Sequence, residues 1–243
     1  MNQEIITKAI VIKSVPYKDN DKILTLLTPD HGKISASLRG ANKPKAKLKF
    51  AGQLFCFAEF DLIQFGSNFT VKTVTEIESF FDISKDFQKL SIGSSILEIC
   101  DKITKEGETN CYPIFLSTLK ALQTLVFSST SPKLVLVKFM LDAFKFCGYE
   151  LTMDRCKNCG AKFNGNIFMN IETGAFVCPL CKTEECMNIS LGAFNIIKLV
   201  SNTEYQNLKS ITVHEHHLDE ILILLNANFT GKFEIIIKSL KNL

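Results

Sequence analysis

The sequence lacks the motifs by which many enzymes bind nucleotides or attack substrates. Its Gly-Lys pairs, Gly32-Lys33 and Gly231-Lys232, have Leu27 and Asn226 where a phosphate-binding loop needs its first glycine. No Gly-x-Gly-x-x-Gly fingerprint occurs, and the segment 93–97 does not have the pattern of a nucleophile elbow. We therefore expect a protein that is not an enzyme and that uses no nucleotide cofactor.

Long apolar segments are missing too. Residues 1–8 do not contain the apolar core of a signal peptide, and the uncharged stretch Cys186 to Ile197 spans only 12 residues. A membrane helix needs about 18 or more. The nine cysteines are an odd number and form no regular disulfide pattern. These absences predict a cytoplasmic protein with reduced thiols and no membrane contact.

Acidic residues are absent from one stretch of the chain. The net charge is only +3, yet residues 33–49 contain basic residues and no acid. We call residues 39–49 the basic loop, because they follow a predicted strand. Lysines at every second position of an extended loop can contact successive phosphates about 6–7 Å apart. The alternative is a loop that is only solvated and binds nothing. The predicted DNA contacts are Lys33, Arg39, Lys43, Lys45, Lys47 and Lys49.

Two Cys-x-x-Cys pairs predict a metal site. Cys156/Cys159 and Cys178/Cys181 are separated by 18 residues, which is typical of a four-thiolate zinc site with sulfurs about 2.3 Å from the ion. Four thiolates leave no position for water, and no histidine lies between residues 32 and 213. We expect one structural Zn²⁺ per chain, in a zinc module at about 154–186.

Two alternatives to this ligand set stay open. A redox dithiol fits less well, because its motif belongs beside a βαβ pattern that the sequence does not show. Cys186 is a fifth nearby thiol that could replace Cys181 as a ligand.

The first 80 residues have the alternating pattern and turn signals of short strands, which favour a small closed barrel. Periodicity does not separate an OB barrel from an SH3-like barrel. Four aromatic residues, Tyr17, Phe55, Phe57 and Phe69, could stack on unpaired bases or fill the barrel. The expected strands cover residues 5–12, 22–28, 33–39, 53–65 and 68–78.

After residue 84 the apolar residues recur at helical spacing. The segment 131–147 is apolar almost all round and should be buried, while 235–240 fits either a strand or a helix. We expect an α+β protein with a DNA-binding barrel at 1–80 and a helical domain at 81–243 that carries the zinc module. The expected helices cover residues 87–103, 114–127, 131–147, 190–200 and 215–228.

Several blocks of the chain resemble the bacterial RecO family. They are Lys8–Ile12, Tyr17–Asp21, Leu26–Lys33, Arg39–Ala41 and Lys238–Leu240, and with the cysteine module they extend over nearly the whole chain. The resemblance implies a five-stranded OB barrel joined to a helical domain with a zinc module.

The resemblance also implies a function. A RecO-like protein is a non-enzymatic mediator of DNA repair and recombination that binds single- and double-stranded DNA and anneals complementary strands without ATP. Its implied partners are RecR, single-strand DNA-binding protein (SSB) and, indirectly, RecA, at the nucleoid in the cytoplasm. The competing interpretation is a non-catalytic, zinc-containing scaffold that binds other proteins and no DNA.

Overall fold

The computed structural model describes residues 3–43, 48–66, 68–149 and 151–242. The chain forms two compact units, Met1–Val126 and Phe127–Leu243. We expected a domain boundary after residue 80, and that boundary stays a prediction. The last strand of the barrel ends at Ser79, but the first compact unit also includes the next two helices.

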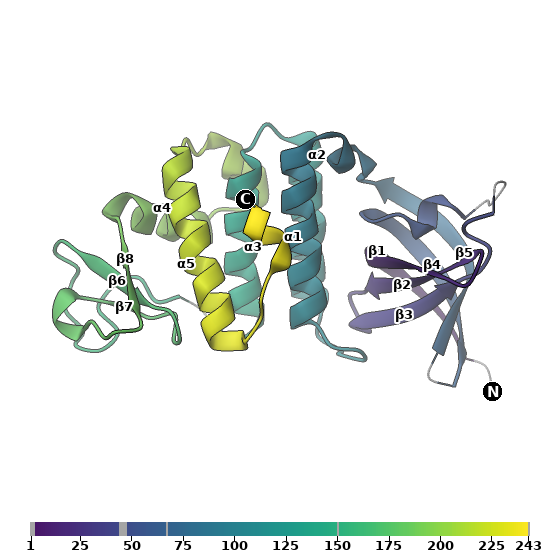
Figure 1. The fold of residues 1–243 in the computed structure, drawn as a ribbon, viewed down its shortest axis with the longest axis horizontal. Helices are drawn as coiled ribbons and strands as arrows, with labels where there is room; N and C mark the ends of the chain where they lie inside the picture. Colours follow the sequence, from purple (N-terminus) through teal and green to yellow (C-terminus); the bar gives the residue numbers. More distant parts are fainter. Residues whose placement is uncertain (1–2, 44–47, 67, 150, 243) are drawn as a thin grey trace. The chain divides into compact units, whose positions relative to one another are not determined.

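The first unit begins with a closed barrel of five strands (Figure 1). The strands are β1 (Gln3–Tyr17), β2 (Asp21–Leu27), β3 (Lys33–Leu38), β4 (Cys56–Phe65) and β5 (Asn68–Ser79). Their order is β1-β2-β3-β5-β4, and β4 pairs back with β1. Among the strand pairs that the structure describes in this barrel, β3–β5 is parallel and the others are antiparallel. This five-stranded Greek-key barrel confirms the predicted OB fold.

Alternation along the strands builds the barrel core, because successive side chains point to opposite faces. Leu24, Leu26, Phe60 and Leu62 are fully buried in it. Each of these side chains stabilises the fold by about 1.5–3 kcal/mol relative to an exposed one. The hydrophobic pattern therefore fixes the register of the strands.

One strand is shorter than expected, since β4 begins at Cys56 and not at residue 53. Phe55 directly precedes the strand, with a φ of 68° that is incompatible with extended backbone, and its side chain is only 2% exposed. Its ring lies against the next helix, where a Cβ on Gly93 would be 3.0 Å from the ring carbon Cε1. Gly93 thus lets the ring approach the helix backbone, which explains a glycine in the middle of a helical pattern.

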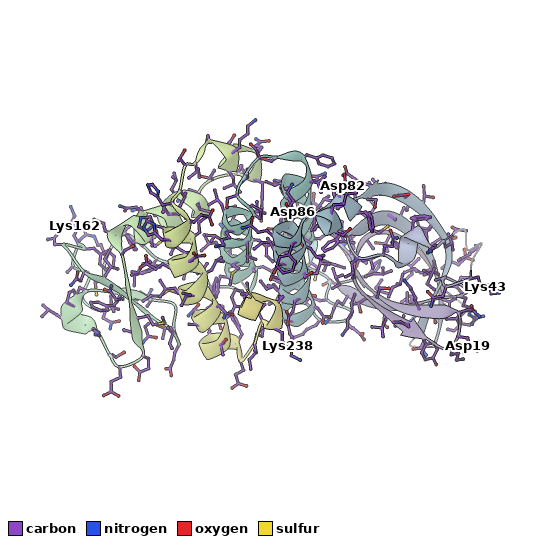
Figure 2. The ribbon with its side chains drawn as sticks, turned by 45° about the horizontal axis from the view of Figure 1, so that its top comes forward. Asp19, Lys43, Asp82, Asp86, Lys162 and Lys238 are labelled. Atoms are coloured by element: carbon purple, nitrogen blue, oxygen red, sulfur yellow. The ribbon has the colours of Figure 1, made fainter. Side chains whose placement is uncertain are left out.

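Two helices complete the first unit, α1 (Phe87–Ile103) and α2 (Tyr112–Phe127). Asp86, labelled in Figure 2, caps α1 because its Oδ1 accepts the backbone N–H of Lys89 at 2.9 Å. On the barrel side, the ring of Phe57 packs edge-on against Phe115, with centroids 6.0 Å apart. The barrel and these helices therefore share apolar contacts.

The second unit contains α3 (Pro132–Phe146), α4 (Leu191–Ser201) and α5 (Glu215–Phe233). α3 is buried almost all round, as predicted, and even Lys138 is only 8% exposed. Its ammonium is paired with Asp142 at 2.9 Å. The rings of Phe144 on α3 and Phe229 on α5 pack at a tilt of 33°, with centroids 4.3 Å apart, and α5 extends beyond the predicted end at residue 228.

A small antiparallel sheet belongs to the same unit, with strands β6 (Ile167–Asn170), β7 (Phe176–Val177) and β8 (Cys186–Ile189) in the order β7-β6-β8. Phe176 packs edge-on against Phe194 of α4 at 5.1 Å, which fixes the sheet to the helices. Short 3-10 helices cover Phe50–Gly52, Phe81–Lys85, Pro179–Cys181, Tyr205–Ser210 and Lys238–Asn242. In the described ranges, no helix has the length and apolar character needed to span a membrane.

Candidate metal centre and nucleic-acid interface

The four predicted cysteine ligands come together in the second unit. The sulfurs of Cys156, Cys159, Cys178 and Cys181 all lie within 4.8 Å of one another, and the Cys159 and Cys178 sulfurs are 3.7 Å apart. Tetrahedral zinc with bonds of about 2.3 Å requires sulfur separations of about 3.8 Å. This group of thiols could therefore hold one metal ion.

The backbone shapes both cysteine knuckles. Gly160 donates its N–H to the carbonyl of Cys156 at 2.9 Å and has φ at 72°, a conformation that glycine adopts without strain. In the second knuckle, Pro179 opens a 3-10 helix, and Cys181 donates to the carbonyl of Cys178 at 3.0 Å. The turn signals in the sequence thus account for the local geometry.

Cys186 does not belong to the cluster. Its sulfur accepts the backbone N–H of Thr183 at 3.4 Å, and it is absent from the group of thiols that could hold a metal. The alternative in which Cys186 replaces Cys181 therefore finds no support in the geometry of the described residues.

The electrostatics of the cluster favour a cation. Burial opposes ionisation of Cys156, but backbone N–H donors from Cys159, Cys178 and Asn158 outweigh it and lower its pKa to about 6. Hydrogen bonding with Cys159, followed by burial, raises the pKa of Cys181 to about 12. A divalent cation removes the repulsion between four thiolates.

The predicted nucleic-acid interface lies at one end of the barrel, where Figure 2 labels Lys43 and Asp19. Arg39, Lys43 and Lys49 are exposed, and within the described part of the chain none of them forms an ion pair. Lys45 and Lys47 lie outside the described residues. Three cations of the basic loop are therefore available to an anionic ligand.

The start of the basic loop is held by the turn between β1 and β2. Asp21 Oδ1 accepts the N–H of Gly40 at 2.7 Å, and the carbonyl of Asn20 accepts the N–H of Asn42 at 2.9 Å. Asp21 beside the loop thus has a structural role, since a carboxylate is a strong acceptor for backbone N–H groups. This anchoring limits the freedom of Arg39 and Lys43.

Lys33 lies apart from the basic loop. It begins β3, whereas Arg39 follows the end of that strand, so about six residue steps place the two roughly 20 Å apart. Its ammonium donates to Asp101 Oδ1 at 3.0 Å and also to the Asp101 carbonyl. Lys33 as a DNA contact stays a prediction, but the structure gives its charge an intramolecular partner on α1.

Lys33 belongs to a clasp between barrel and helix, which we define as Thr28, Gly32 and Lys33 with the 105–108 turn after α1. The Thr28 hydroxyl donates to the Gly32 carbonyl at 2.9 Å, and the Lys33 N–H donates to the Lys105 carbonyl at 3.1 Å. These three residues belong to the block Leu26–Lys33, which is part of the family resemblance. The clasp therefore gives a structural reason for the residues of that block.

The aromatic candidates for base stacking divide into buried and exposed. Phe55 and Phe57 are 2% and 7% exposed, which favours the alternative in which they fill the core, and Phe69 packs against the barrel core. Tyr17 is 46% exposed, and the ammonium of Lys18 lies 5.3 Å from its ring centroid. Lys18, which the sequence analysis did not single out, thus lies beside the exposed aromatic candidate.

The fold and the cluster together define a class: an OB-barrel protein with a four-cysteine centre in a helical second half. Two family models match the chain, "Recombination protein O N terminal" over residues 1–80 and "Recombination protein O C terminal" over residues 84–241. The chain therefore belongs to the RecO family of DNA repair proteins.

Its relatives cover most of the chain. "DNA repair protein RecO" of Clostridium novyi is 28% identical over 235 residues, which is 97% of this chain and 91% of the relative. The protein of the same name from Acetivibrio thermocellus is 29% identical over 219 residues, 88% of this chain and 86% of the relative. That of Clostridium acetobutylicum is 26% identical over 236 residues, 96% and 94% of the two chains.

Proposed function

We propose that this protein is a DNA-repair and recombination mediator whose basic loop binds the phosphates of the DNA backbone. It binds single- and double-stranded DNA, anneals complementary strands without ATP, and acts with RecR to load RecA onto DNA coated by SSB. It works in the cytoplasm at the nucleoid and catalyses no reaction. The family membership supports this proposal, as do the names of the relatives, which are DNA repair proteins.

The observation that carries the proposal is the gathering of exposed cations in the basic loop, a stretch of the sequence that contains no acid. Arg39, Lys43 and Lys49 are exposed without an ion pair among the described residues, whereas Lys33 and Lys72 are paired with acids. Unpaired cations at one end of a barrel suit a polyanion, because they lose no internal contact when phosphates arrive and release counterions.

The DNA proposal predicts a salt dependence. If about four cations neutralise phosphates of a single strand, log affinity against log salt falls with a slope of about −3. Lys43→Gln combined with Lys49→Gln reduces the steepness by about 1.4, because each lost contact removes about 0.7. The matched control is Lys102→Gln with Lys105→Gln, which removes the same charge from exposed positions of α1 and the turn after it.

Filter binding or fluorescence anisotropy with a fluorescent oligonucleotide measures both slopes. A slope near zero in the wild type, or equal slopes in the two double variants, would contradict backbone recognition by the basic loop. Absence of DNA binding at low salt would leave the protein-interaction scaffold as the better hypothesis. A strand-annealing assay with and without ATP tests the mediator activity, and addition of RecR, SSB and RecA tests the partners.

We propose zinc as the ion of the four-cysteine centre, in a structural role. Soft thiolates select zinc over magnesium or calcium, and a complete sulfur shell leaves no position for a substrate or water. Metal analysis of the purified protein should find one zinc per chain. A ratio near zero in protein purified without chelators would refute this part of the proposal.

A further inference from the structure

The outer face of the barrel changes in character along β1, β2 and β3, which lie side by side (Figure 1). Near the clasp, Ile10 is opposite Leu27 and Leu27 is opposite Lys33, so the three side chains share one face. On this face the ammonium of Lys33 contacts Asp101 of α1, and Ile10 and Leu27 are fully buried. This row of side chains therefore lies under the helix.

A β-bulge in β1 separates the covered row from an open part of the same face. The pairing of β1 with β2 shifts by one residue between Val11 and Lys13, and such an extra residue re-aims the side chains that follow it. Lys13 is exposed, and Val15 and Tyr17 are 45% and 46% exposed. Because alternate residues of a strand face the same side, these three side chains point to solvent together.

Three rows of side chains cross the strands in this open part of the face. They are about 6.7 Å apart, so together they extend over roughly 13 Å toward the basic loop. Arg39 directly follows β3 and continues its register opposite Asp21. We call them the open rows, which are Lys13–Thr25–Ser35, Val15–Ile23–Ser37 and Tyr17–Asp21–Arg39.

Tyr17 places an aromatic ring in the open row nearest to the basic loop. The ammonium of Lys18 lies over this ring, 5.3 Å from its centroid, where a cation is attracted to the ring. Lys18 has φ at 53°, a conformation that glycine or asparagine adopts more easily. The exposed ring thus has beside it a cation that can meet a phosphate.

The charges at this end of the barrel are mixed. Three exposed cations and two acids occupy it, namely Lys18, Arg39, Lys43, Asp19 and Asp21. Asp21 already accepts the N–H of Gly40. Phosphates are attracted to the cations, whereas the two carboxylates disfavour a phosphate directly against the β1–β2 turn. The ring of Tyr17 is therefore suited to an uncharged group of a polyanion.

We propose that Tyr17 stacks on a base of an unpaired DNA strand whose phosphates lie against the basic loop and Lys18. The strand continues across the open rows toward Lys13. Every base has a π-face, so this contact is independent of sequence. Bases in a duplex already stack on their neighbours, so the ring serves single strands. This inference rests on the proposed DNA function and deepens it, because it makes Tyr17 the residue that favours unpaired over paired DNA.

The test compares two fluorescent probes with full-length, zinc-loaded protein. One probe is an oligothymidine of about 12 nucleotides, a length within the range that OB folds bind. The other has the same number of phosphates joined by tetrahydrofuran sugars that carry no bases. Fluorescence anisotropy at low salt should show at least about fivefold tighter binding of the oligothymidine, because stacking of one base on an aromatic side chain is worth that factor or more.

Variants of the ring assign this preference to its source. Tyr17→Ala should bring the two affinities within about twofold of each other and leave the affinity for the base-free probe unchanged. Tyr17→Phe keeps the ring and should keep the preference. Tyr112→Ala is the matched control, since Tyr112 is 56% exposed at the start of α2, and it should change neither affinity. Affinity for a duplex should be the same in Tyr17→Ala and in the wild type.

A second readout reports the contact directly. Tyr17→Trp introduces the only tryptophan of the chain. The oligothymidine should quench its fluorescence, and the base-free probe should not. Quenching by both probes, or by neither, would contradict stacking of this side chain on a base.

Two results with the affinity probes would overturn the inference. Equal affinity of the wild type for both probes would mean that phosphates account for all of the binding. Weaker binding of the base-free probe by Tyr17→Ala would mean that the ring only supports the turn. In either case, oligonucleotides that still bind with a salt slope of about −3 leave the proposed function intact. If neither probe binds at low salt, the proposed function fails and this inference fails with it.

Discussion

Replacing Gly32 with alanine tests whether the clasp between barrel and helix is a structural element. Gly32 has φ at 61°, and an added Cβ would lie 2.5 Å from the Lys105 carbonyl oxygen and 2.9 Å from the backbone N and O of Glu108. All three close atoms belong to the backbone, so no flexible side chain can move aside. The 105–108 turn must shift for the variant to fold.

The expected loss of stability has two parts. A left-handed conformation costs alanine about 1–2 kcal/mol. Displacing the turn breaks the 3.1 Å hydrogen bond from Lys33 to Lys105 and weakens its neighbours, which costs about 1–2 kcal/mol more. We therefore expect Gly32→Ala to lower the free energy of unfolding by about 3 kcal/mol.

A second glycine of the clasp, in the 105–108 turn, gives the control. Gly107 also has a positive φ, 72°, but a Cβ there would meet nothing within 4 Å. Gly107→Ala should cost only the conformational part, about 1–2 kcal/mol. The difference between the two variants isolates the steric contact that the clasp imposes.

Urea unfolding followed by circular dichroism measures both variants, because the chain has no tryptophan for fluorescence. With a slope near 2 kcal/mol per molar, the midpoint should fall by about 1.5 M for Gly32→Ala and by about half that for Gly107→Ala. Hydrogen exchange of β3 amides assigns the effect to the first unit. Equal losses in the two variants would refute the steric explanation.

Three further predictions concern the clasp, the metal and the buried thiols. Lys33→Met should lower stability by about 1 kcal/mol, because it leaves Asp101 unpaired, while oligonucleotide affinity stays at the wild-type level; a large loss of affinity would return Lys33 to the DNA interface. Cys178→Ser should lose zinc and raise hydrogen exchange in the zinc module, whereas Cys186→Ser should keep one zinc per chain; equal metal content in the two would contradict the ligand set. Burial raises the pKa of the Cys56 and Cys100 thiols to about 12 from 9.0. Because unfolding lets these thiols ionise, their contribution to stability is complete below pH 9.0 and falls as the pH rises above it. Brief alkylation at pH 8 with mass mapping should leave both thiols unmodified in the native protein. Labelling as fast as at Cys186 would show that they are accessible and would contradict the prediction.

Local patterns in the sequence predicted much of the fold. Period-2 alternation and turn residues located the five strands, and the cysteine spacing located the cluster, because these signals are short-range. The order of the strands could not be predicted in this way. The parallel contact between Ala36 and Phe69 joins residues far apart in the sequence, and the period of a strand contains no information on its partner. Only the resemblance to a family selected the OB barrel over its alternative.

The misjudged residues share a physical cause. Phe55 looks like a strand residue, yet its positive φ and its contact with Gly93 depend on a helix nearly 40 residues further along the chain. Lys33 looks like part of a basic run, but its partner on α1 is 68 residues away. Charge counts treat neighbours in sequence as neighbours in space, and strand β3 separates Lys33 from the basic loop.

The clasp also affects how genetic results should be interpreted. Its residues, Thr28, Gly32 and Lys33, are among the easiest to recognise from sequence, so they are natural targets for mutagenesis. Under the proposed repair function, a cell carrying a clasp variant would become sensitive to DNA damage when chaperones and proteases remove the unstable protein, since about 1–2 kcal/mol changes abundance several-fold. Survival assays would then score these positions as essential for repair even though their side chains need never meet a nucleotide. Immunoblots of steady-state protein levels would distinguish this loss of abundance from a true binding defect.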